Sequence, residues 1–287
     1  MPFIRGGSAK VLVGAHDLTG FINNASVSVD SGLVEATVFG ELYRDYLESI
    51  QMATATVSGF YDNQVWSNST PLVAGLDDIV SDRSAEDEAA SYPQGILAAT
   101  TTVDATKGYA PITIAWAGNT ALNTAFVGAV SSADYETGND VANLTSFAAN
   151  FNCAASWETS LGGTKGTTQK SGFSTRGVLL APLAAYSTAA AAIGSTHDNA
   201  ASSANGCIIN LHGQFIGSSG TCSVRVEHAT VLGGPYTTVG TFSNIDTTSG
   251  PYGQSLIVSG TINRYVRAYL VTTMTGGQTL AVSYARL

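Results

Sequence analysis

The chain has 287 residues, a length that fits one large or two ordinary domains. Hydrophobic residues make up 44% of it, enough for a buried core, whereas charged residues make up only 11%, against about a quarter in typical soluble domains. The net charge of −9 excludes a general nucleic-acid binder, because contacts to phosphates require clustered Lys and Arg.

The charge is unevenly distributed along the chain. Residues 1–150 hold 17 of the 21 acidic side chains and five of the 12 basic ones, a net charge of −12. Residues 151–287 hold four acids and seven bases, a net charge of +3. An acidic region of this kind would repel DNA phosphates, and the alternative is that it only keeps the chain soluble. Few charges overall suit a protein that buries surface against other subunits.

The first half of the chain has the pattern of short strands. Period-two alternation and short apolar runs predict strands at Lys10–Val13, Ser26–Asp30, Val34–Phe39, Thr54–Phe60, Ile96–Val103, Thr113–Trp116, Phe126–Ala133 and Val141–Cys153. Ser31-Gly32 is expected to turn the chain. Apolar residues at helical spacing predict helices at Glu41–Ile50 and at Leu72–Val80.

A segment rich in Gly, Thr and Ser, Ala154–Ser171, separates the two halves and is expected to be a linker or an exposed hairpin. Beyond it, strands are predicted at Gly177–Leu180, Cys207–Phe215, Thr221–His228, Thr237–Phe242, Gln254–Ser259, Tyr265–Thr273 and Gln278–Ala285. The apolar stretch Gly177–Ile193 is too short and too polar to span a bilayer and reads as a strand followed by a loop. Short strands separated by turn signals predict a sandwich or barrel.

Three features near the N-terminus, in this order, resemble the tail tube proteins of long-tailed (siphovirus-like) bacteriophages. They are the opening Asp17-Leu18-Thr19-Gly20-Phe21-Ile22-Asn23, the strand end Ala36-Thr37-Val38-Phe39-Gly40, and the strand Val57-Ser58-Gly59-Phe60-Tyr61-Asp62. The last third resembles the rear part of major tail proteins from the same group at Asp198–Ser202, Val226–His228 and Gly260–Arg267.

This resemblance implies a mainly β fold. Residues 1–170 would form a tail-tube-type antiparallel β-sandwich or barrel with a short lateral helix, and residues 171–287 a second sandwich-like β domain, tube-like or a decoration. The chain would be a virion protein of the tail and not an enzyme. Its copies would close through sheet edges into hexameric rings, or into three-subunit rings with pseudo-sixfold symmetry, and the rings would stack into a tube.

The resemblance also implies the partners of the chain. These would be copies of itself and other tail proteins such as the tape measure and terminator proteins. Genome DNA would pass through the tube without specific binding, past a wall that the acidic first half would line. Assembly would take place in the host cytoplasm without a membrane, and the first seven residues show no apolar run of the signal-peptide type.

No residue is expected to be catalytic, cofactor-binding or metal-binding, and no cofactor is expected. The run Asp77–Glu88 has six acids in twelve residues, but it lacks the residue order of a calcium loop and favours a solvated segment. Cys207, His212, Cys222 and His228 are residue types that bind zinc. Cys207 and His212 should nevertheless lie on opposite faces of one strand, which favours a buried or hydrogen-bonded histidine.

Ser195-Thr196-His197-Asp198 contains the residue types of a hydrolase triad, but adjacent residues cannot converge on one point, and Asp198-Asn199 is expected to form a turn. The three cysteines, Cys153, Cys207 and Cys222, are expected to be small buried hydrophobic residues and not a disulfide framework. Arg264 and Arg267 are expected on opposite strand faces, either with one paired inside or at an interface, or both as ordinary surface arginines.

Glycines beside aromatic residues, at Phe39-Gly40 and Gly59-Phe60-Tyr61-Asp62, are expected to fix backbone turns. Two other functions stay open from the sequence. A capsid decoration or minor virion protein would share the β-rich, weakly charged character. A secreted carbohydrate-binding β-protein would share it too, but would call for a signal peptide and paired cysteines.

Overall fold

The computed structural model describes residues 9–35, 46–60, 110–130, 132–138, 145–154, 156–159, 165–170, 172–213, 219–242, 245–246 and 252–287. Within these ranges the chain forms nineteen β-strands and no helix, and the named strand pairs are all antiparallel. The mainly β fold expected from the sequence is therefore confirmed.

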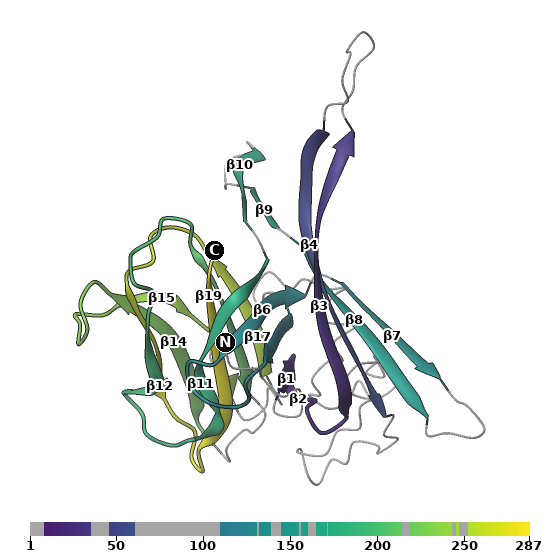
Figure 1. The fold of residues 1–287 in the computed structure, drawn as a ribbon. Helices are drawn as coiled ribbons and strands as arrows, with labels where there is room; N and C mark the ends of the chain where they lie inside the picture. The colour runs from purple at the N-terminus through teal and green to yellow at the C-terminus, as the bar shows by residue number, and fades with distance from the viewer. Residues whose placement is uncertain are drawn as a thin grey trace.

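The largest sheet has eight strands in the order β17-β13-β19-β11-β6-β5-β1-β2 (Figure 1). Their bounds are β1 Lys10–Val13, β2 His16–Asp17, β5 Ala110–Ala115, β6 Thr124–Val130, β11 Phe173–Tyr186, β13 Cys207–Gly213, β17 Tyr252–Val258 and β19 Gln278–Arg286. The sheet curls so far that its two ends meet, because Gly253 of β17 packs against the backbone of Gly14 between β1 and β2. We call this sheet the curled sheet.

A second sheet of four strands packs against the part of the curled sheet that contains β1, β5 and β6. It runs in the order β3-β4-β8-β7, with β3 Ile22–Glu35, β4 Tyr46–Phe60, β7 Ser132–Gly138 and β8 Ser146–Ala154. Its apolar side chains, among them Val57 and Phe151, share one buried core with Ile112 and Phe126 of the curled sheet. Figure 1 shows β3 and β4 continuing together as a ribbon well beyond this core.

A third sheet packs against the part of the curled sheet that contains β11, β13 and β19. It consists of β12 Ala191–Asp198, β18 Tyr265–Thr272, β14 Thr221–Ala229 and β15 Thr237–Thr241, and the short β16 Ile245–Asp246 pairs with β14. Val224 and Leu270 of this sheet pack against Ile209 and Leu280 of the curled sheet. The two outer sheets lie at opposite ends of the molecule in Figure 1.

Most predicted strands in the described ranges are confirmed. Lys10–Val13 matches β1 at both ends, and the strands predicted from Cys207 onward overlap β13 to β19. The segment Ala154–Ser171 contains β9 Ser156–Thr159 and β10 Lys165–Lys170, which pair as a hairpin, one of the two alternatives expected for it. The loop expected after Leu180 is wrong, because β11 continues to Tyr186 and β12 begins at Ala191.

The helix predicted at Glu41–Ile50 is wrong where the structure describes it. Residues 46–50 begin β4, and Leu47 pairs with Val34 and Glu48 with Leu33 of β3. Long-range pairing with β3 satisfies the backbone of this segment, which outweighs its local helical spacing. Glu41–Asp45, the predicted helix Leu72–Val80, the predicted strand Ile96–Val103 and Phe39-Gly40 lie outside the described residues.

The turn predicted at Ser31-Gly32 is also wrong, and the turn predicted at Gly59-Phe60-Tyr61-Asp62 lies only in part within the described residues. Ser31 and Gly32 lie inside β3, which continues to Glu35 with a shift in pairing register between Ser31 and Leu33. A bulge of this kind accommodates glycine without ending the strand. Gly59 lies inside β4, where a Cβ atom would come within 1.9 Å of the Phe21 carbonyl oxygen, so glycine permits this close approach.

The division into domains 1–170 and 171–287 stays a prediction. The curled sheet contains strands from both sides of this boundary, since β6 pairs with β11 through Gly128 and Phe173. The predicted boundary between residues 170 and 171 therefore cuts through one hydrogen-bonded sheet.

Candidate functional site

The outer face of the sheet β3-β4-β8-β7, which we call the acidic face, is the most distinctive surface of the described chain. The strand register aligns its side chains in rows across the sheet, of which two are Asn24–Ser58–Ala148–Glu136 and Ser26–Thr56–Asn150–Asp134. The alternate residues of the same strands point into the core. Period-two alternation therefore gives this sheet one apolar and one polar face.

Thr and Asn side chains on the acidic face bind one another across neighbouring strands. Thr54 Oγ1 donates to Asn152 Oδ1 at 2.9 Å, and Thr56 Oγ1 donates to Asn150 Oδ1 at 2.8 Å. These hydroxyl groups already donate within the sheet, so the face presents uncharged side chains held in place by their neighbours.

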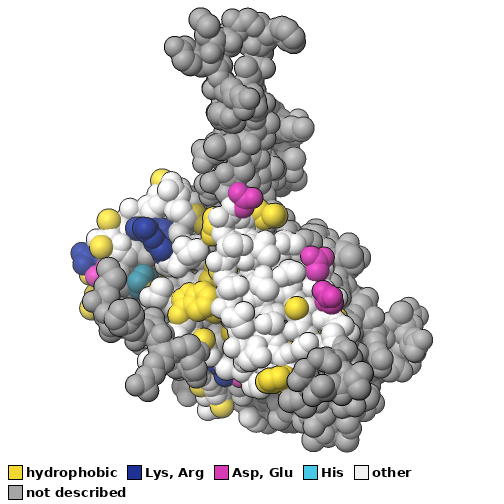
Figure 2. Space-filling view, turned by 45° about the vertical axis from the view of Figure 1, so that its right-hand side comes forward, with side chains coloured by type: hydrophobic (Ala, Val, Ile, Leu, Met, Phe, Trp, Pro, Cys, Tyr) yellow, Lys and Arg dark blue, Asp and Glu magenta, His cyan; other side chains and the backbone are white. Residues whose placement is uncertain are grey.

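The charges on this face have one sign. Asp30, Asp134 and Glu136 are exposed on it, and the four strands contain no Lys, Arg or His anywhere in their sequences. Figure 2 shows scattered acidic side chains on a broad uncharged face, whereas Lys and Arg gather on another part of the molecule. The acidic face therefore has a negative potential that repels polyanions.

Each edge strand of this sheet has one side without a partner strand in the part of the chain that the structure describes. Among the described residues, β3 pairs only with β4, and β7 pairs only with β8. Val29, on the core-facing side of β3, is 48% exposed at this edge. Unpaired edges with exposed aliphatic side chains are templates for pairing with another chain.

A buried polar cluster joins the two ends of the curled sheet. His212 Nδ1 donates to the Gly14 carbonyl oxygen at 2.6 Å, so the neutral ring accepts at Nε2 from Thr113 Oγ1 at 2.8 Å. Thr113 Oγ1 then accepts from Ser283 Oγ at 2.7 Å, and Asn210 Nδ2 donates to the Ile112 carbonyl oxygen at 2.9 Å. We call this cluster the polar seam. The sequence indicated a hydrogen-bonded histidine, but not its partners, which lie about a hundred residues or more away.

The polar seam predicts a loss of stability in acid. Burial lowers the pKa of His212 from 6.5 to about 4. The unfolded chain therefore binds a proton that the folded chain does not, and the free energy of unfolding should fall as the pH drops from about 6.5 to about 4. The decrease is at most ~1.4 kcal/mol per pH unit for this group, about 3 kcal/mol in all.

Urea unfolding between pH 7.5 and 4 measures this effect, and a His212→Gln variant should show a shallower pH dependence by close to one proton. Burial also lowers the pKa of His16, His197 and His228, so the variant flattens the dependence without abolishing it. An NMR titration of folded protein in which His212 titrates near 6.5 would contradict the prediction.

The residues that raised the possibility of zinc are not brought together. Cys207 and Cys222 are buried in the core between the curled sheet and the third sheet, whereas His212 points to the opposite side of β13, as alternation predicted. His228 Nδ1 accepts from the Asn263 backbone N–H at 3.1 Å. Among the described residues no group of three His, Cys, Asp or Glu side chains could hold a metal ion.

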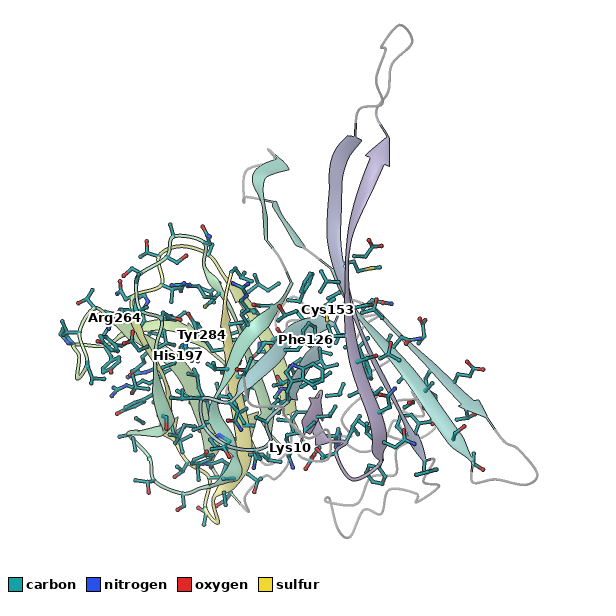
Figure 3. The ribbon with its side chains drawn as sticks, viewed as in Figure 1. Lys10, Phe126, Cys153, His197, Arg264 and Tyr284 are labelled. Atoms are coloured by element: carbon teal, nitrogen blue, oxygen red, sulfur yellow. The ribbon has the colours of Figure 1, made fainter. Side chains whose placement is uncertain are left out.

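The segment Ser195–Asp198 does not form a catalytic relay. Asp198 accepts two hydrogen bonds from Arg264, both of 2.7 Å, and these hold the pKa of the carboxyl group at about 2. His197 instead lies beside the Tyr284 ring, with ring centroids 6.1 Å apart (Figure 3). The Ala200 N–H donates to Asp198 Oδ1 at 2.8 Å, which confirms the predicted turn.

The remaining candidates have structural surroundings or lie outside the described ranges. All three cysteines are free and buried, as expected, and burial raises the pKa of Cys153 and Cys207 to about 12. The acidic run Asp77–Glu88 is not among the described residues. The described part of the chain contains no helix of the length and apolarity needed to cross a membrane.

Arg264 and Arg267 are both paired. Arg264 precedes β18 and binds Asp198, and Arg267 binds the buried Glu227 through Nε and Nη2 at 2.9 and 2.8 Å. Glu227 also binds Arg225 at 2.6 Å. Sequence reasoning missed this cluster of two arginines on one carboxylate. The signal for part of it was the period-two spacing of Arg225 and Glu227, which places both on one face of β14.

Comparisons with known proteins give only remote likenesses. No protein-family model and no curated protein matches the chain. A chain from the virion of a native gene transfer agent particle is 9% identical, with a TM-score of 0.29, and the match covers 53% of this chain and 95% of that one.

The Dit protein of SPP1, described as a paradigm of the hub adsorption apparatus in phages that infect Gram-positive bacteria, is 12% identical. Its TM-score is 0.28, and the match covers 96% of this chain and 98% of that one. At TM-scores below 0.5, neither likeness decides the function of this chain.

Proposed function

We propose that this chain is a phage structural protein, the major subunit of a tail tube. Its copies would form rings in which the acidic faces line a central channel. The observation that carries the proposal is the sheet β3-β4-β8-β7. Its edge strands have no second partner among the described residues, its outer face carries acidic and uncharged polar side chains, and its four strands contain no basic residue. The sequence resemblance to tail tube proteins supports the same role.

The order of strands in this sheet suits ring closure. Four antiparallel strands place β3 and β7 at opposite edges and make them run in opposite directions. Copies related by rotation about one axis would therefore pair β7 of one copy with β3 of the next as antiparallel strands. Val29, exposed on the core-facing side of β3, would be covered by this contact. One such sheet within the described ranges of the chain favours six copies over three.

The acidic face would form the wall of the channel. A negative wall repels DNA phosphates, and side chains that hydrogen-bond one another across strands offer few strong donors to the passing DNA. The proposal places the chain in the virion tail, with the tape measure and terminator proteins as further partners. It requires no catalytic residue and no cofactor.

Electron microscopy of the purified full chain tests this proposal. Rings with a central hole, or tubes built from stacked rings, are the expected result. Single rings that never stack would point to a ring-only part of the virion, such as a hub. A chain that stays monomeric at high concentration would contradict self-assembly and favour a decoration protein.

A charge reversal tests the role of the wall. The double variant Asp134→Lys/Glu136→Lys should still form tubes, because both side chains are exposed and have no basic partner on the described face. Its tubes should retain DNA at low salt, and phage that carry it should lose at least about tenfold in infectivity through slowed ejection. DNA binding to the tubes, followed by fluorescence anisotropy, is the measurement.

A double variant that adds the same charge elsewhere is the matched control. Thr237→Lys/Thr241→Lys places two lysines at exposed positions of β15, at the opposite end of the molecule. This control should leave ejection unchanged if charge matters only inside the channel. Equal DNA retention by both variants would show that the acidic face does not line the channel.

A further inference from the structure

The outer face of β14 and β18 carries a cluster that the tube wall does not use. Arg225, Glu227, Arg267 and Tyr269 lie on this face, and Tyr236 reaches over it from the connection between β14 and β15. We call these five residues the Arg–Tyr face. It belongs to the third sheet, at the end of the molecule opposite the acidic face (Figure 1), and Figure 3 shows Arg264 at this same end.

The two arginines of the Arg–Tyr face are held in place before any partner arrives. Glu227 is 2% exposed, and each of its carboxylate oxygens binds one guanidinium group, Oε1 to Arg225 at 2.6 Å and Oε2 to Arg267 at 2.8 Å. The Arg267 guanidinium carbon lies 3.7 Å from the centre of the Tyr236 ring. Guanidinium groups fixed in this way lose little further freedom when they bind an anion.

A buried carboxylate that binds two partly exposed arginines needs a reason beyond stability. Burying the Glu227 carboxylate costs free energy that its attraction to the arginines has to offset, whereas the side chains of Arg225 and Arg267 stay 33% and 24% exposed. The region around the cluster also has surplus positive charge, since residues 172–213, 219–242, 245–246 and 252–287 contain five arginines and three acids. Binding of an acidic partner would use both features.

Two exposed aliphatic residues lie next to the cluster in the chain, and we call them the aliphatic tip. Val231 and Leu232 are 54% and 69% exposed at the turn that leads to Tyr236. Arg and Tyr are enriched at protein–protein interfaces, and the buried centre of an interface is more apolar than the rest of the protein surface. An anionic polysaccharide would have no use for the aliphatic tip, so these residues favour a protein segment that has both acidic and apolar side chains.

One segment of this chain has that chemistry. Asp77–Glu88 contains six acids together with Ile79 and Val80. It lies within residues 61–109, between the end of β4 at Phe60 and the start of β5 at Ala110. The seventeen residues from Phe60 to Asp77 can span up to about 55 Å, enough to reach a neighbouring molecule. We infer that the Arg–Tyr face docks the segment Asp77–Glu88 of a neighbouring copy, an inference that rests on the proposed ring assembly.

Peptide binding tests the chemistry of this contact. A labelled peptide of residues 71–90 is titrated into the full chain, in which the acids of its own segment Asp77–Glu88 have been changed to their amides to remove competition. The peptide should bind, and Leu232→Ser should weaken it at least fivefold. A triple variant, Arg225→Gln/Glu227→Gln/Arg267→Gln, should weaken it at least tenfold without leaving a charge unpaired.

Matched controls separate docking from general attraction. Leu122→Ser, at an aliphatic side chain that is 39% exposed in the β5–β6 connection, should leave peptide binding unchanged. A peptide in which the acids are replaced by amides should bind at least tenfold more weakly than the native one. Binding that is absent, or unaffected by Leu232→Ser and the triple variant, overturns the inference.

A disulfide experiment identifies the copy that supplies the segment. Rings are assembled from an equal mixture of a Ser81→Cys chain and a Leu232→Cys chain, and the expected product is a disulfide between the two chains. A disulfide that forms only when both cysteines are in one chain overturns the inference. Rings without the inter-chain disulfide also overturn it and leave the tube proposal standing. Peptide binding by a chain that forms no rings supports the docking chemistry and overturns the tube.

Discussion

A Thr137→Lys variant is expected to fold as a monomer and to form no rings. Thr137 is exposed near the end of the edge strand β7, and its pairing with Phe147 places it on the core-facing side of the sheet. In the free subunit, a lysine there can extend into water. In a ring the lysine would lie on the core-facing side of the sheet, beside β3 of the neighbouring copy. An inward-pointing charge on an edge strand blocks strand pairing.

The opposite edge should respond in the same way. Val29→Lys changes an exposed aliphatic side chain on the core-facing side of β3 and should also abolish rings. Each variant keeps one intact edge, so an equal mixture should form one-to-one heterodimers through β7 of the Val29→Lys chain and β3 of the Thr137→Lys chain. Size-exclusion chromatography with light scattering measures both results.

Thr241→Lys is the matched control for these edge variants. Thr241 is exposed on β15, an edge strand of the third sheet, so the same substitution there should leave ring formation unchanged. Normal rings from Thr137→Lys, or homodimers in place of heterodimers, would contradict closure through β3 and β7.

Gly253→Ala should destabilise the monomer strongly. A Cβ atom on Gly253 would lie 2.4 Å from the Gly14 carbonyl carbon and 2.8 Å from the Ala15 nitrogen, and both are backbone atoms that cannot rotate away. The two ends of the curled sheet would have to separate. We expect a loss of about 2–4 kcal/mol in the free energy of unfolding, measured by urea denaturation.

The same substitution should weaken the pH dependence of stability. Separating Gly14 from β17 lengthens the hydrogen bond between His212 and the Gly14 carbonyl oxygen and admits water to the ring, which returns its pKa toward 6.5. Gly253→Ala and His212→Gln should therefore be less than additive, because both act on the polar seam. Gly20→Ala is the control, since a Cβ atom there has no heavy atom within 4 Å. A loss as large in Gly20→Ala would contradict this explanation.

The strands were predictable wherever one face of a sheet is buried. Alternation in Ser26–Asp30 and Thr54–Phe60 is read directly from the sequence, because a half-buried strand requires it. The helix predicted at Glu41–Ile50 failed for the converse reason. Its spacing of apolar residues fits a helix locally, but residues 46–50 pair with β3, and local spacing contains no information about a partner strand.

The candidate surfaces were likewise predictable only in part. The sequence indicated an acidic first half, and the described acids of that half include the three on the acidic face. It did not show that Asp30, Asp134 and Glu136 share one face, since this depends on the register of β3, β4, β8 and β7. Nor did it show that Arg225 and Arg267 bind one carboxylate, because β14 and β18 are neighbours only in the folded chain.

The sequence by itself determined the β-rich character, the separation of charge between the two halves and the burial of the three cysteines. These properties follow from composition and from a period of two residues, which act locally. Only the tertiary structure decided the curl of the large sheet, the polar seam of Thr113, His212 and Ser283, and the places of β3 and β7 as the outer strands of their sheet. Each of these depends on which distant strands become neighbours, and that choice is made by the packing of whole sheets.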